Sequence, residues 1–233
     1  MNKILVVPDV HGRTFWRKAI EMIDEVDKVV FLGDYLDPYP SEGINFEEAI
    51  SEFVSILQFK ETYSDKVILL IGNHDCNYIW QEFPKSSRYS WFKAEEISKL
   101  FNKNIDKFQL IYQYDNYLFS HAGVYKDWMD LCNFTLDDLT NIEEIRTNNW
   151  PSLYCVGAIR GGWRGVGSCV WADIRESGLY DLYSDKYQIV GHTQLKEPFI
   201  SDNIACLDCR KCFIVCGDEI KAVSEEANSE VKS

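Results

Sequence analysis

The sequence predicts an α/β fold built around a parallel β-sheet. Three short runs of apolar and β-branched residues, at 3–7, 28–32 and 66–71, have the length and composition of buried strands. Two stretches between them, 14–26 and 46–59, place their apolar residues at helical spacing. A strand–helix–strand–helix–strand order implies parallel strands that are joined by right-handed crossovers.

The rest of the chain has a less regular pattern. We expect a helix over 91–101, a hairpin over 108–120, a strand over 186–190 and closing β-structure over 203–223. The segment 157–178 is rich in Gly, Arg and Trp, a composition that favours a long functional loop over a linker.

The length and composition fit one folded domain. The chain has 233 residues, of which 46% are hydrophobic, and this is enough to bury a sizeable core. We expect residues 1–223 to form a single domain and the polar segment 224–233 to be a disordered tail.

The charge and the apolar runs exclude several classes of partner. A formal net charge of -13 repels polyanions, so duplex nucleic acid is an unfavourable partner. No apolar run approaches the roughly 20 residues that cross a membrane, and Pro8-Asp9 interrupts the apolar start too early for a signal peptide. We therefore expect a cytoplasmic protein without a membrane partner, whose eight cysteines are mostly free thiols.

Five apolar runs end in polar residues of one chemical kind. Residues that follow parallel strands meet at the same edge of a sheet even when they are distant in the sequence. A glycine beside each polar group lets the chain turn sharply there. The five segments are VVPDVHG with Asp9 and His11, VFLGDYLD with Asp34 and Asp37, LLIGNHD with Asn73, His74 and Asp75, YLFSHAG with His121, and QIVGH with His192.

These residues predict a site for two metal ions. A single histidine at a strand end is more often a hydrogen-bonded structural residue, but all four histidines of the chain occur in these segments. Carboxylate, imidazole and amide ligands suit Mn, Fe or Zn, whereas a closed structural Zn site would be expected to use thiolates. A carboxylate that bridges two such cations is the arrangement used for in-line phosphoryl displacement.

The ordered segments resemble the calcineurin-like metallophosphoesterase superfamily. The blocks of that family are D-x-H, G-D-x-x-D, G-N-H-[DE], a later H, and G-H. They stand here in the same order between residues 9 and 193, so the resemblance covers most of the chain. The matching segments are Asp9-Val10-His11, Gly33 to Asp37, Gly72 to Asp75, Ser120 to Gly123 and Gly191-His192-Thr193.

The resemblance implies a fold, an activity and a role for each residue. The fold would be an αββα sandwich of two β-sheets flanked by helices, with a dinuclear metal site at the strand ends, and residues 1–223 would be its catalytic domain. His74, oriented by Asp37, would be the general acid that protonates the leaving group. The metal ligands would be Asp9 and His11 at the first ion, Asp34 as the bridge, and Asn73, His121 and His192 at the second ion.

Within the superfamily, the chain looks closest to the serine/threonine protein phosphatases and the symmetrical dinucleoside-tetraphosphatases. The Ser120-His121-Ala122-Gly123 and Trp171-Ala172-Asp173 blocks are similar to that branch. Gln194 stands where many phosphodiesterases have a second histidine after G-H. The resemblance therefore implies an enzyme that hydrolyses phosphate monoesters, on a protein or a small molecule, by in-line attack of a metal-bridging hydroxide. A dinucleoside-polyphosphate hydrolase and a phosphodiesterase stay open as alternatives.

The chain departs from this branch at the residue that normally binds the phosphate. The branch has D-R-G where this chain has Asp37-Pro38-Tyr39, so an arginine from elsewhere has to take that role. The candidates are Arg13, Arg160, Arg164 and Arg175, and we expect Arg13 or Arg164 to bind substrate. Arg164 is favoured because it lies in the glycine-rich segment.

A run of cysteines indicates a different class of function. Cys206, Cys209, Cys212 and Cys216 have the spacing of a bacterial ferredoxin run, which would belong to an iron–sulfur or redox protein. No proline follows Cys216, and we expect the segment 204–215 to form a hairpin. Cysteines three residues apart on a strand face opposite sides, so their thiolates would not converge easily. The phosphoesterase is therefore the favoured hypothesis.

Overall fold

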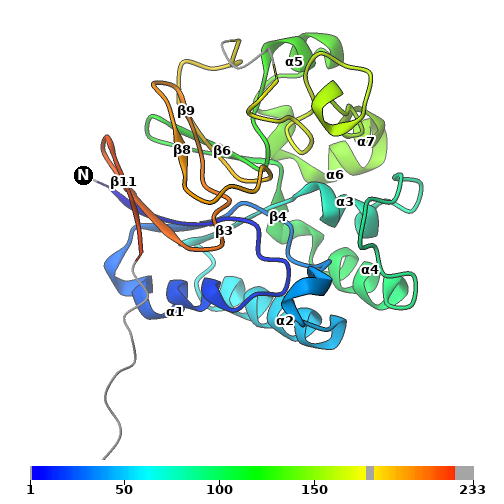
Figure 1. Cartoon of the computed structure of the whole chain (residues 1–233), viewed down its shortest axis with the longest axis vertical. Coiled ribbons are helices and arrows are strands. Elements are labelled where there is room, and N and C mark those ends of the chain that lie inside the picture. The colour runs from blue at the N-terminus through cyan, green and yellow to red at the C-terminus, as the bar shows by residue number, and fades with distance from the viewer. Residues whose placement is uncertain (1, 177–180, 224–233) are drawn as a thin grey trace, which may run out of the picture.

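Two β-sheets pack face to face in the computed structural model, which describes residues 2–176 and 181–223 (Figure 1). Helices flank this pair of sheets, as the resemblance implied, and the predicted fold class is confirmed. The segment 224–233, expected to be a tail, lies outside the described residues. None of the described helices is long and apolar enough to cross a membrane.

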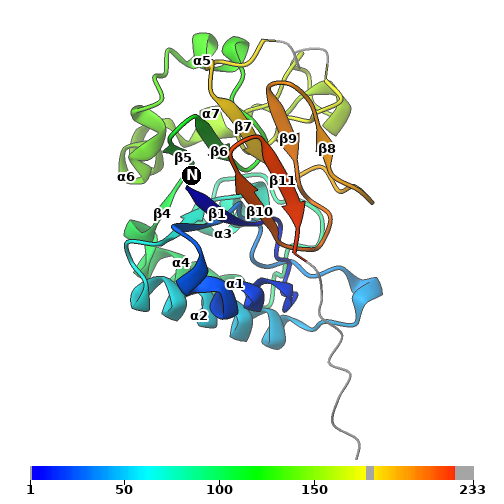
Figure 2. The ribbon, with the colours of Figure 1, turned by 90° about the vertical axis from the view of Figure 1, so that its left-hand side faces the viewer.

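The first sheet contains the predicted parallel core. Within the described residues its six strands lie in the order β11-β10-β1-β2-β3-β4, and β1 to β4 are parallel. The two strands nearest the carboxyl end of the chain, β10 and β11, pair antiparallel at one edge (Figure 2). The strands are β1 (Lys3–Val7), β2 (Lys28–Phe31), β3 (Val67–Leu70), β4 (Phe108–Gln109), β10 (Phe213–Cys216) and β11 (Glu219–Ala222).

The second sheet has a parallel centre as well. Its described strands lie in the order β5-β6-β7-β9-β8, with β6, β7 and β9 parallel to one another. β5 and β6 form the predicted hairpin. The strands are β5 (Ile111–Tyr114), β6 (Tyr117–Ser120), β7 (Tyr187–Val190), β8 (Phe199–Ile200) and β9 (Ile204–Cys206).

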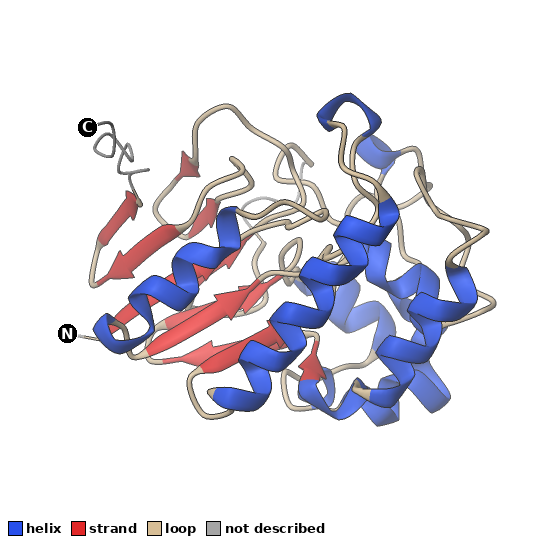
Figure 3. Cartoon of the chain, turned by 90° about the horizontal axis from the view of Figure 1, so that it is seen from below, coloured by secondary structure: helices blue, strands red, loops and turns tan. Residues whose placement is uncertain are grey.

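The helices lie on the outer side of the first sheet and beyond the strand ends (Figure 3). The longest, α2, begins with a capping box in which the Asn45 side chain accepts from the Glu48 N–H and the Glu48 carboxylate accepts from the Asn45 N–H. The α-helices are α1 (Lys18–Met22), α2 (Phe46–Thr62), α3 (Asn73–Ile79), α4 (Ala94–Lys103), α5 (Lys126–Cys132), α6 (Ile142–Glu144) and α7 (Trp150–Leu153). A π-helical turn, Ile145–Asn149, joins α6 to α7.

Alternation along the strands divides the core into two layers. In β1, Leu5 packs toward the helices, whereas Ile4 and Val6 pack between the two sheets. Phe119 of β6 lies in the same inter-sheet layer. Each fully buried aliphatic side chain of this kind contributes about 1.5–3 kcal/mol relative to exposure. The packing therefore holds the two sheets in one fixed relationship, which matters because both sheets supply the site described below.

The structure corrects the predicted hairpin over 204–215. β9 pairs with β7 and β8 in the second sheet, whereas β10 pairs with β1 and β11 in the first. The chain crosses between the sheets here, through Arg210 in a left-handed conformation with φ 60°. The apolar residues of both strands do pack together, but across the sandwich and not along a hairpin.

Three other boundaries differ from the predictions. The predicted helix over 14–26 is divided into a short α1 with a 3-10 turn on each side. The helix expected over 91–101 starts at Ala94, because Trp91 and Phe92 are exposed at 73% and 101% and have no core to face. The hairpin expected over 108–120 begins at Ile111, because Phe108–Gln109 form the short strand β4, which pairs with β3 in the first sheet.

Candidate metal centre

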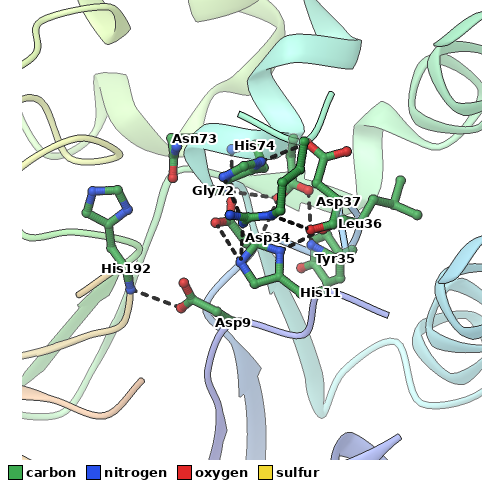
Figure 4. A network of polar contacts seen from close by, with 12 residues as sticks. Asp9, His11, Asp34, Tyr35, Leu36, Asp37, Gly72, Asn73, His74 and His192 are labelled. Carbon is green, nitrogen blue, oxygen red and sulfur yellow. Dashed lines mark hydrogen bonds and ion pairs between the residues drawn. The ribbon is translucent and has the colours of Figure 1, made fainter. Parts of the chain in front are cut away.

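The carboxyl ends of parallel strands from both sheets meet at one place (Figure 4). This convergence places the polar residues of all five predicted segments in a single cluster, although they are up to 183 residues apart. Asp9 and His11 follow β1, Asp34 and Asp37 follow β2, Asn73 and His74 begin α3 directly after β3, His121 follows β6, and His192 follows β7.

Four of these residues have a backbone conformation that non-glycine residues rarely adopt. The φ angles of His11, Asp34, Asp37 and His192 are 47°, 54°, 59° and 63°. Each such conformation is strained by on the order of 1–3 kcal/mol and persists only where the surrounding structure fixes it. The strain is concentrated at the strand ends that carry the candidate ligands, which is typical of a functional site.

Two glycines leave the space that the carboxylates occupy. A Cβ on Gly191 would lie 2.2 Å from Asp9 Oδ1, and one on Gly72 would lie 2.2 Å from Asp34 Oδ1. Any larger residue at either position would displace the carboxylate. The glycines next to the polar residues therefore serve the close approach of two segments as well as the turn.

Asp34 lies at the centre of the cluster. Its Oδ2 is 3.5 Å from His11 Nε2 and 3.7 Å from His121 Nε2. Among the described residues, two groups have ligand atoms close enough to hold a metal ion, and Asp34 belongs to both. One group contains His11 and His74 beside Asp34, and the other contains Asp9 and His121. A carboxylate shared in this way can bridge two cations.

The hydrogen bonds of two histidines direct a lone pair into the cluster. His11 donates through Nδ1 to the Leu36 carbonyl at 2.7 Å, and His121 donates through Nδ1 to the Leu32 carbonyl at 2.8 Å. Because a carbonyl only accepts, each neutral imidazole carries its proton on Nδ1 and is left with a lone pair on Nε2. Such backbone contacts commonly orient metal-binding histidines.

The side chains of Asn73, His121 and His192 bring hydrogen-bond acceptors close to one another. His121 Nε2 lies 3.1 Å from Asn73 Oδ1 and 3.1 Å from His192 Nδ1. Neither His121 Nε2 nor the amide oxygen carries a proton, so their contact is unfavourable unless a cation lies between them. The donor set, which is one amide, two imidazoles and the carboxylates, fits a divalent ion of the Mn, Fe or Zn type.

The electrostatics favour the metal-binding forms of three candidate ligands, Asp34, His11 and His192. Burial raises the pKa of Asp34, but the adjacent His121, His74 and His11 outweigh it and lower the pKa to about 2. Burial lowers the pKa of His11 and of His192 well below the ordinary value, and for His192 Arg160 adds to the effect. Asp34 is therefore ionised and both imidazoles are neutral near pH 7, as metal coordination requires.

His74 and Asp37 form a separate pair beside the cluster. His74 Nδ1 lies 2.7 Å from Asp37 Oδ2, and the Tyr78 hydroxyl donates to the other carboxylate oxygen. The His74 backbone N–H donates to Asp34 Oδ1 at 2.9 Å, so the pair is fixed relative to Asp34, the carboxylate common to both candidate metal groups. Burial raises the pKa of Asp37, although its bonds to His74 and Tyr78 oppose the shift.

Arg88 is a site residue that the sequence did not reveal. Its Nη2 lies 3.2 Å from His74 Nε2 and 3.5 Å from His11 Nε2, and its Nε donates to the Asp37 carbonyl at 2.9 Å. The guanidinium lies 3.8 Å from the centre of the Tyr39 ring. No described carboxylate forms an ion pair with Arg88, so its charge is uncommitted. The sequence around Arg88 contains no motif that indicates a function, and only the fold brings this residue to the site.

The candidate arginines from the sequence lie in other places. Arg13 borders the site and donates to the Asp9 carbonyl at 3.2 Å, but both Glu42 carboxylate oxygens bind it, at 2.8 Å and 3.1 Å. Arg160 lies 2.7 Å from the Asp173 carboxylate, which Arg175 also binds. Arg164 is exposed on the wall of a neighbouring cleft, and no described contact joins it to the ligand cluster.

Asp75 has a structural role that was not predicted from its position in the sequence. Its carboxylate accepts backbone N–H groups from Gly72, Asp34 and Tyr35 at 2.8 Å, 2.8 Å and 3.1 Å. It thereby ties the loop after β2 to the loop after β3, which positions Asp34.

The cysteine run does not converge. Cys206 lies on β9 and donates to the carbonyls of Gly191 and Thr193, whereas Cys212 donates to the Phe15 carbonyl. Neither of the two metal-binding groups found among residues 2–176 and 181–223 contains a cysteine. The arrangement offers no four-thiolate site, because Cys206 on β9 and Cys216 on β10 lie in different sheets.

Comparisons with known proteins agree with this geometry. Residues 2–195 match the model of the calcineurin-like phosphoesterase family. A cold-active protein-tyrosine phosphatase of a psychrophile, Shewanella sp., has a similar structure with a TM-score of 0.65 and 16% identity, over 94% of this chain and 77% of that chain. A protein serine/threonine phosphatase from Saccharomyces cerevisiae gives a TM-score of 0.59 and 15% identity, over 97% of this chain and 82% of that one. No curated protein matches the sequence at a significant level.

Proposed function

The chain belongs to the calcineurin-like phosphoesterase family, and on that premise we propose that it is a dinuclear-metal phosphatase that hydrolyses phosphate monoesters. The observation that carries the choice of monoesters is Arg88, a cation without a carboxylate partner that points at the ligand cluster. A monoester phosphoryl group has one more charged oxygen than a diester, and a guanidinium binds two such oxygens at once.

In this proposal the two halves of the cluster each hold one divalent ion. The first would be held by Asp9 and His11, the second by Asn73, His121 and His192, and Asp34 would serve both. The ligand atoms of Asp9 and His121 also lie close together, so Asp9 stands between the two proposed ion positions. Bound divalent ions would supply Lewis-acid stabilisation of the phosphoryl oxygens and lower the pKa of an attacking water. The lone pairs that His11 and His121 direct inward support this assignment.

His74 would donate a proton to the leaving-group oxygen, and Asp37 would position it. The contact of Nδ1 with Asp37 leaves Nε2 facing the cluster, where Arg88 Nη2 lies 3.2 Å away. The Asp37 carboxylate fixes the orientation of the imidazole, so that Nε2 is the atom that would transfer the proton. Tyr78 holds Asp37 in place by donating to its other oxygen.

Arg88 would bind the phosphoryl oxygens and replace the arginine that the D-R-G pattern lacks here. The segment that carries it is anchored at several points: Ser86 N–H donates to Asn77 Oδ1 at 3.2 Å, and Ser90 N–H donates to the Tyr78 hydroxyl at 3.0 Å. The guanidinium is therefore preorganised, and binding a substrate would need little further ordering.

The two structural neighbours support a monoester substrate, because one is a protein-tyrosine phosphatase and the other a protein serine/threonine phosphatase. A panel of phosphopeptides and small phosphate monoesters distinguishes a phosphoprotein substrate from a small-molecule one. Arg13 remains a proposed secondary contact, since it borders the site but is already bound by Glu42.

The proposal is tested with purified protein loaded with Mn²⁺ and assayed with 4-nitrophenyl phosphate and with bis(4-nitrophenyl) phosphate. We expect turnover of the monoester with a kcat/KM well above that of the diester, and loss of both activities in a chelator. Faster hydrolysis of the diester would favour a phosphodiesterase, and hydrolysis of neither ester would contradict the proposed activity.

A further inference from the structure

A cleft of about 550 Å³ adjoins the metal centre on the side of His192. It lies between the end of α5, the residues around α7 and the glycine-rich segment 157–167. Its walls include Tyr154, Arg160, Trp163, Arg164 and Trp171. A cavity of this size is large enough for a small organic group.

Two residues of the cleft also contact the metal centre. The Trp171 ring meets the His192 ring edge-on, with 5.9 Å between their centres. Arg160 donates to the His192 carbonyl and to the Thr193 hydroxyl, both at 3.1 Å. The cleft therefore lies next to His192, and a group attached to a phosphate at the metal centre would reach it past Trp171.

The rim of the cleft presents a tryptophan on a fixed backbone. The Trp163 side chain is 99% exposed, although the turn that carries it is tied together by hydrogen bonds. Ala158 N–H donates to the Arg164 carbonyl at 2.9 Å, and Gly162 N–H donates to the Gly157 carbonyl at 3.0 Å. A large apolar ring held in water by a rigid turn has a free face for stacking.

Glu176 holds this turn against the rest of the segment. Its buried carboxylate accepts the Gly167 N–H at 3.1 Å, and a Cβ on Gly157 would lie 1.6 Å from one of its oxygens. Only glycine fits at position 157, where the turn begins. The arrangement of Trp163 is thus set by the sequence around it and does not depend on a ligand.

The charge of the cleft is opposite to the charge of the chain. Two arginines line it, of which Arg160 is paired with Asp173, and no aspartate or glutamate lines it among the described residues, in a protein with a net charge of -13. Arg164 has no ion-pair partner among the described residues, and the buried Trp171 Nε1–H lacks an acceptor. By contrast, the cavity of about 630 Å³ near Asn2 is lined by Asp115, Asp185, Asp202 and Asp218.

We propose that this cleft binds the organic part of the substrate, and that this part is a planar aromatic group with a second negative charge. The inference rests on the proposed phosphatase function. Trp163 would stack on the aromatic plane, and Arg164 would pair with the second anionic group. The phosphoryl group would lie at the metal centre, beyond Trp171.

The first test compares substrates with the Mn²⁺-loaded full chain. In Trp163→Ala, the ratio of kcat/KM for phenyl phosphate to that for glycerol 2-phosphate falls about three- to tenfold, as expected for loss of one aromatic contact. In Arg164→Gln, the ratio for 4-carboxyphenyl phosphate over phenyl phosphate falls about two- to fivefold. The matched controls, Phe92→Ala and Arg17→Gln, change an exposed ring and an arginine outside this cleft, and both ratios stay at the wild-type value.

The second test measures binding without turnover. Calorimetric titration with 4-(phosphonomethyl)benzoate, whose C–P bond is not hydrolysed, gives a weaker Kd in both cleft variants than in the wild type and the controls. An active enzyme with unchanged ratios and an unchanged Kd overturns the cleft proposal alone. If the wild type hydrolyses none of the esters, the proposed function fails, and the calorimetric comparison still decides whether the cleft binds an aromatic anion.

Discussion

His74 Nδ1 lies 2.7 Å from Asp37 Oδ2, and both residues are buried between the loops that follow β2 and β3. The imidazole is oriented by this contact while its backbone N–H holds Asp34, the carboxylate common to both candidate metal groups. In the proposed mechanism the acid pair and the metal ligands have separate functions, and one short segment of α3 joins them.

The His74→Ala variant should retain its metals and lose activity. Removal of a general acid typically slows turnover about 10²–10⁴-fold, and an ester with a better leaving group should recover part of the loss because it needs no proton. Metal content by mass spectrometry and kcat for 4-nitrophenyl and 2,4-dinitrophenyl phosphate test this. His74 also lies within ligand distance of His11 and Asp34, so loss of one ion in the variant would identify it as a ligand and contradict its role as acid.

Replacement of Arg88 should impair monoester hydrolysis more than diester hydrolysis. Arg88→Gln removes the uncommitted charge, and kcat/KM for 4-nitrophenyl phosphate should fall about 10²–10³-fold with metal content unchanged. Arg88→Lys keeps the charge but loses the two-pronged contact and should recover only part of the activity. Arg17→Gln, at a surface arginine paired with Glu52, is the matched control. An equal loss for both esters would contradict a phosphate-binding role.

The Gly191→Ala variant should bind metal poorly. The new methyl group would lie 2.2 Å from Asp9 Oδ1, which also accepts the His192 N–H at 2.9 Å, so both ligands would have to shift. We expect Mn²⁺ affinity to fall at least about tenfold and stability to fall by about 1–3 kcal/mol. Calorimetric titration and urea unfolding measure the two effects. Gly165→Ala, where a Cβ meets nothing within 4 Å, should behave as wild type.

Two thiols of the cysteine run, those of Cys209 and Cys212, should react slowly near neutral pH. Burial, reinforced by Asp208, raises the pKa of Cys209 to about 11, and burial raises that of Cys212 to about 12. A raised pKa leaves less reactive thiolate at a given pH, so alkylation of Cys209 at pH 7.5 should be about two orders of magnitude slower than in the unfolded chain. The rate should climb until about pH 11. Peptide mass spectrometry after iodoacetamide treatment measures it, and a midpoint near 8.5 would contradict the expectation.

The sequence revealed the candidate ligands because each one follows an apolar strand and each segment keeps its order along the chain. Asp9, Asp34 and His121 belong to segments whose local pattern already marks the end of a strand. Arg88 has no such marker, since it lies between elements and reaches the site through contacts with Asp37 and Tyr39. The spacing of residues along the sequence does not predict such contacts between distant segments.

The local sequence pattern also could not predict which strands belong to which sheet. Successive residues alternate between the two faces of β9 and of β10 as they would in a hairpin. The pairing of the strands is decided by which edge is free in each sheet, and β10 pairs with β1 while β9 pairs with β7. The same limit applies to Arg164, whose glycine-rich surroundings indicated a functional loop but not the cleft that the loop borders.

The central claim is that one carboxylate holds two metal ions, and a metal titration of the metal-free chain with Mn²⁺ tests it most directly. Equilibrium dialysis should give two ions per wild-type chain, with phosphatase activity appearing as the second ion is bound. Asp34→Asn should lose both tight sites while Asp24→Asn, at an exposed carboxylate, keeps them. Full activity with a single ion per chain, or two tight ions in Asp34→Asn, would contradict the claim.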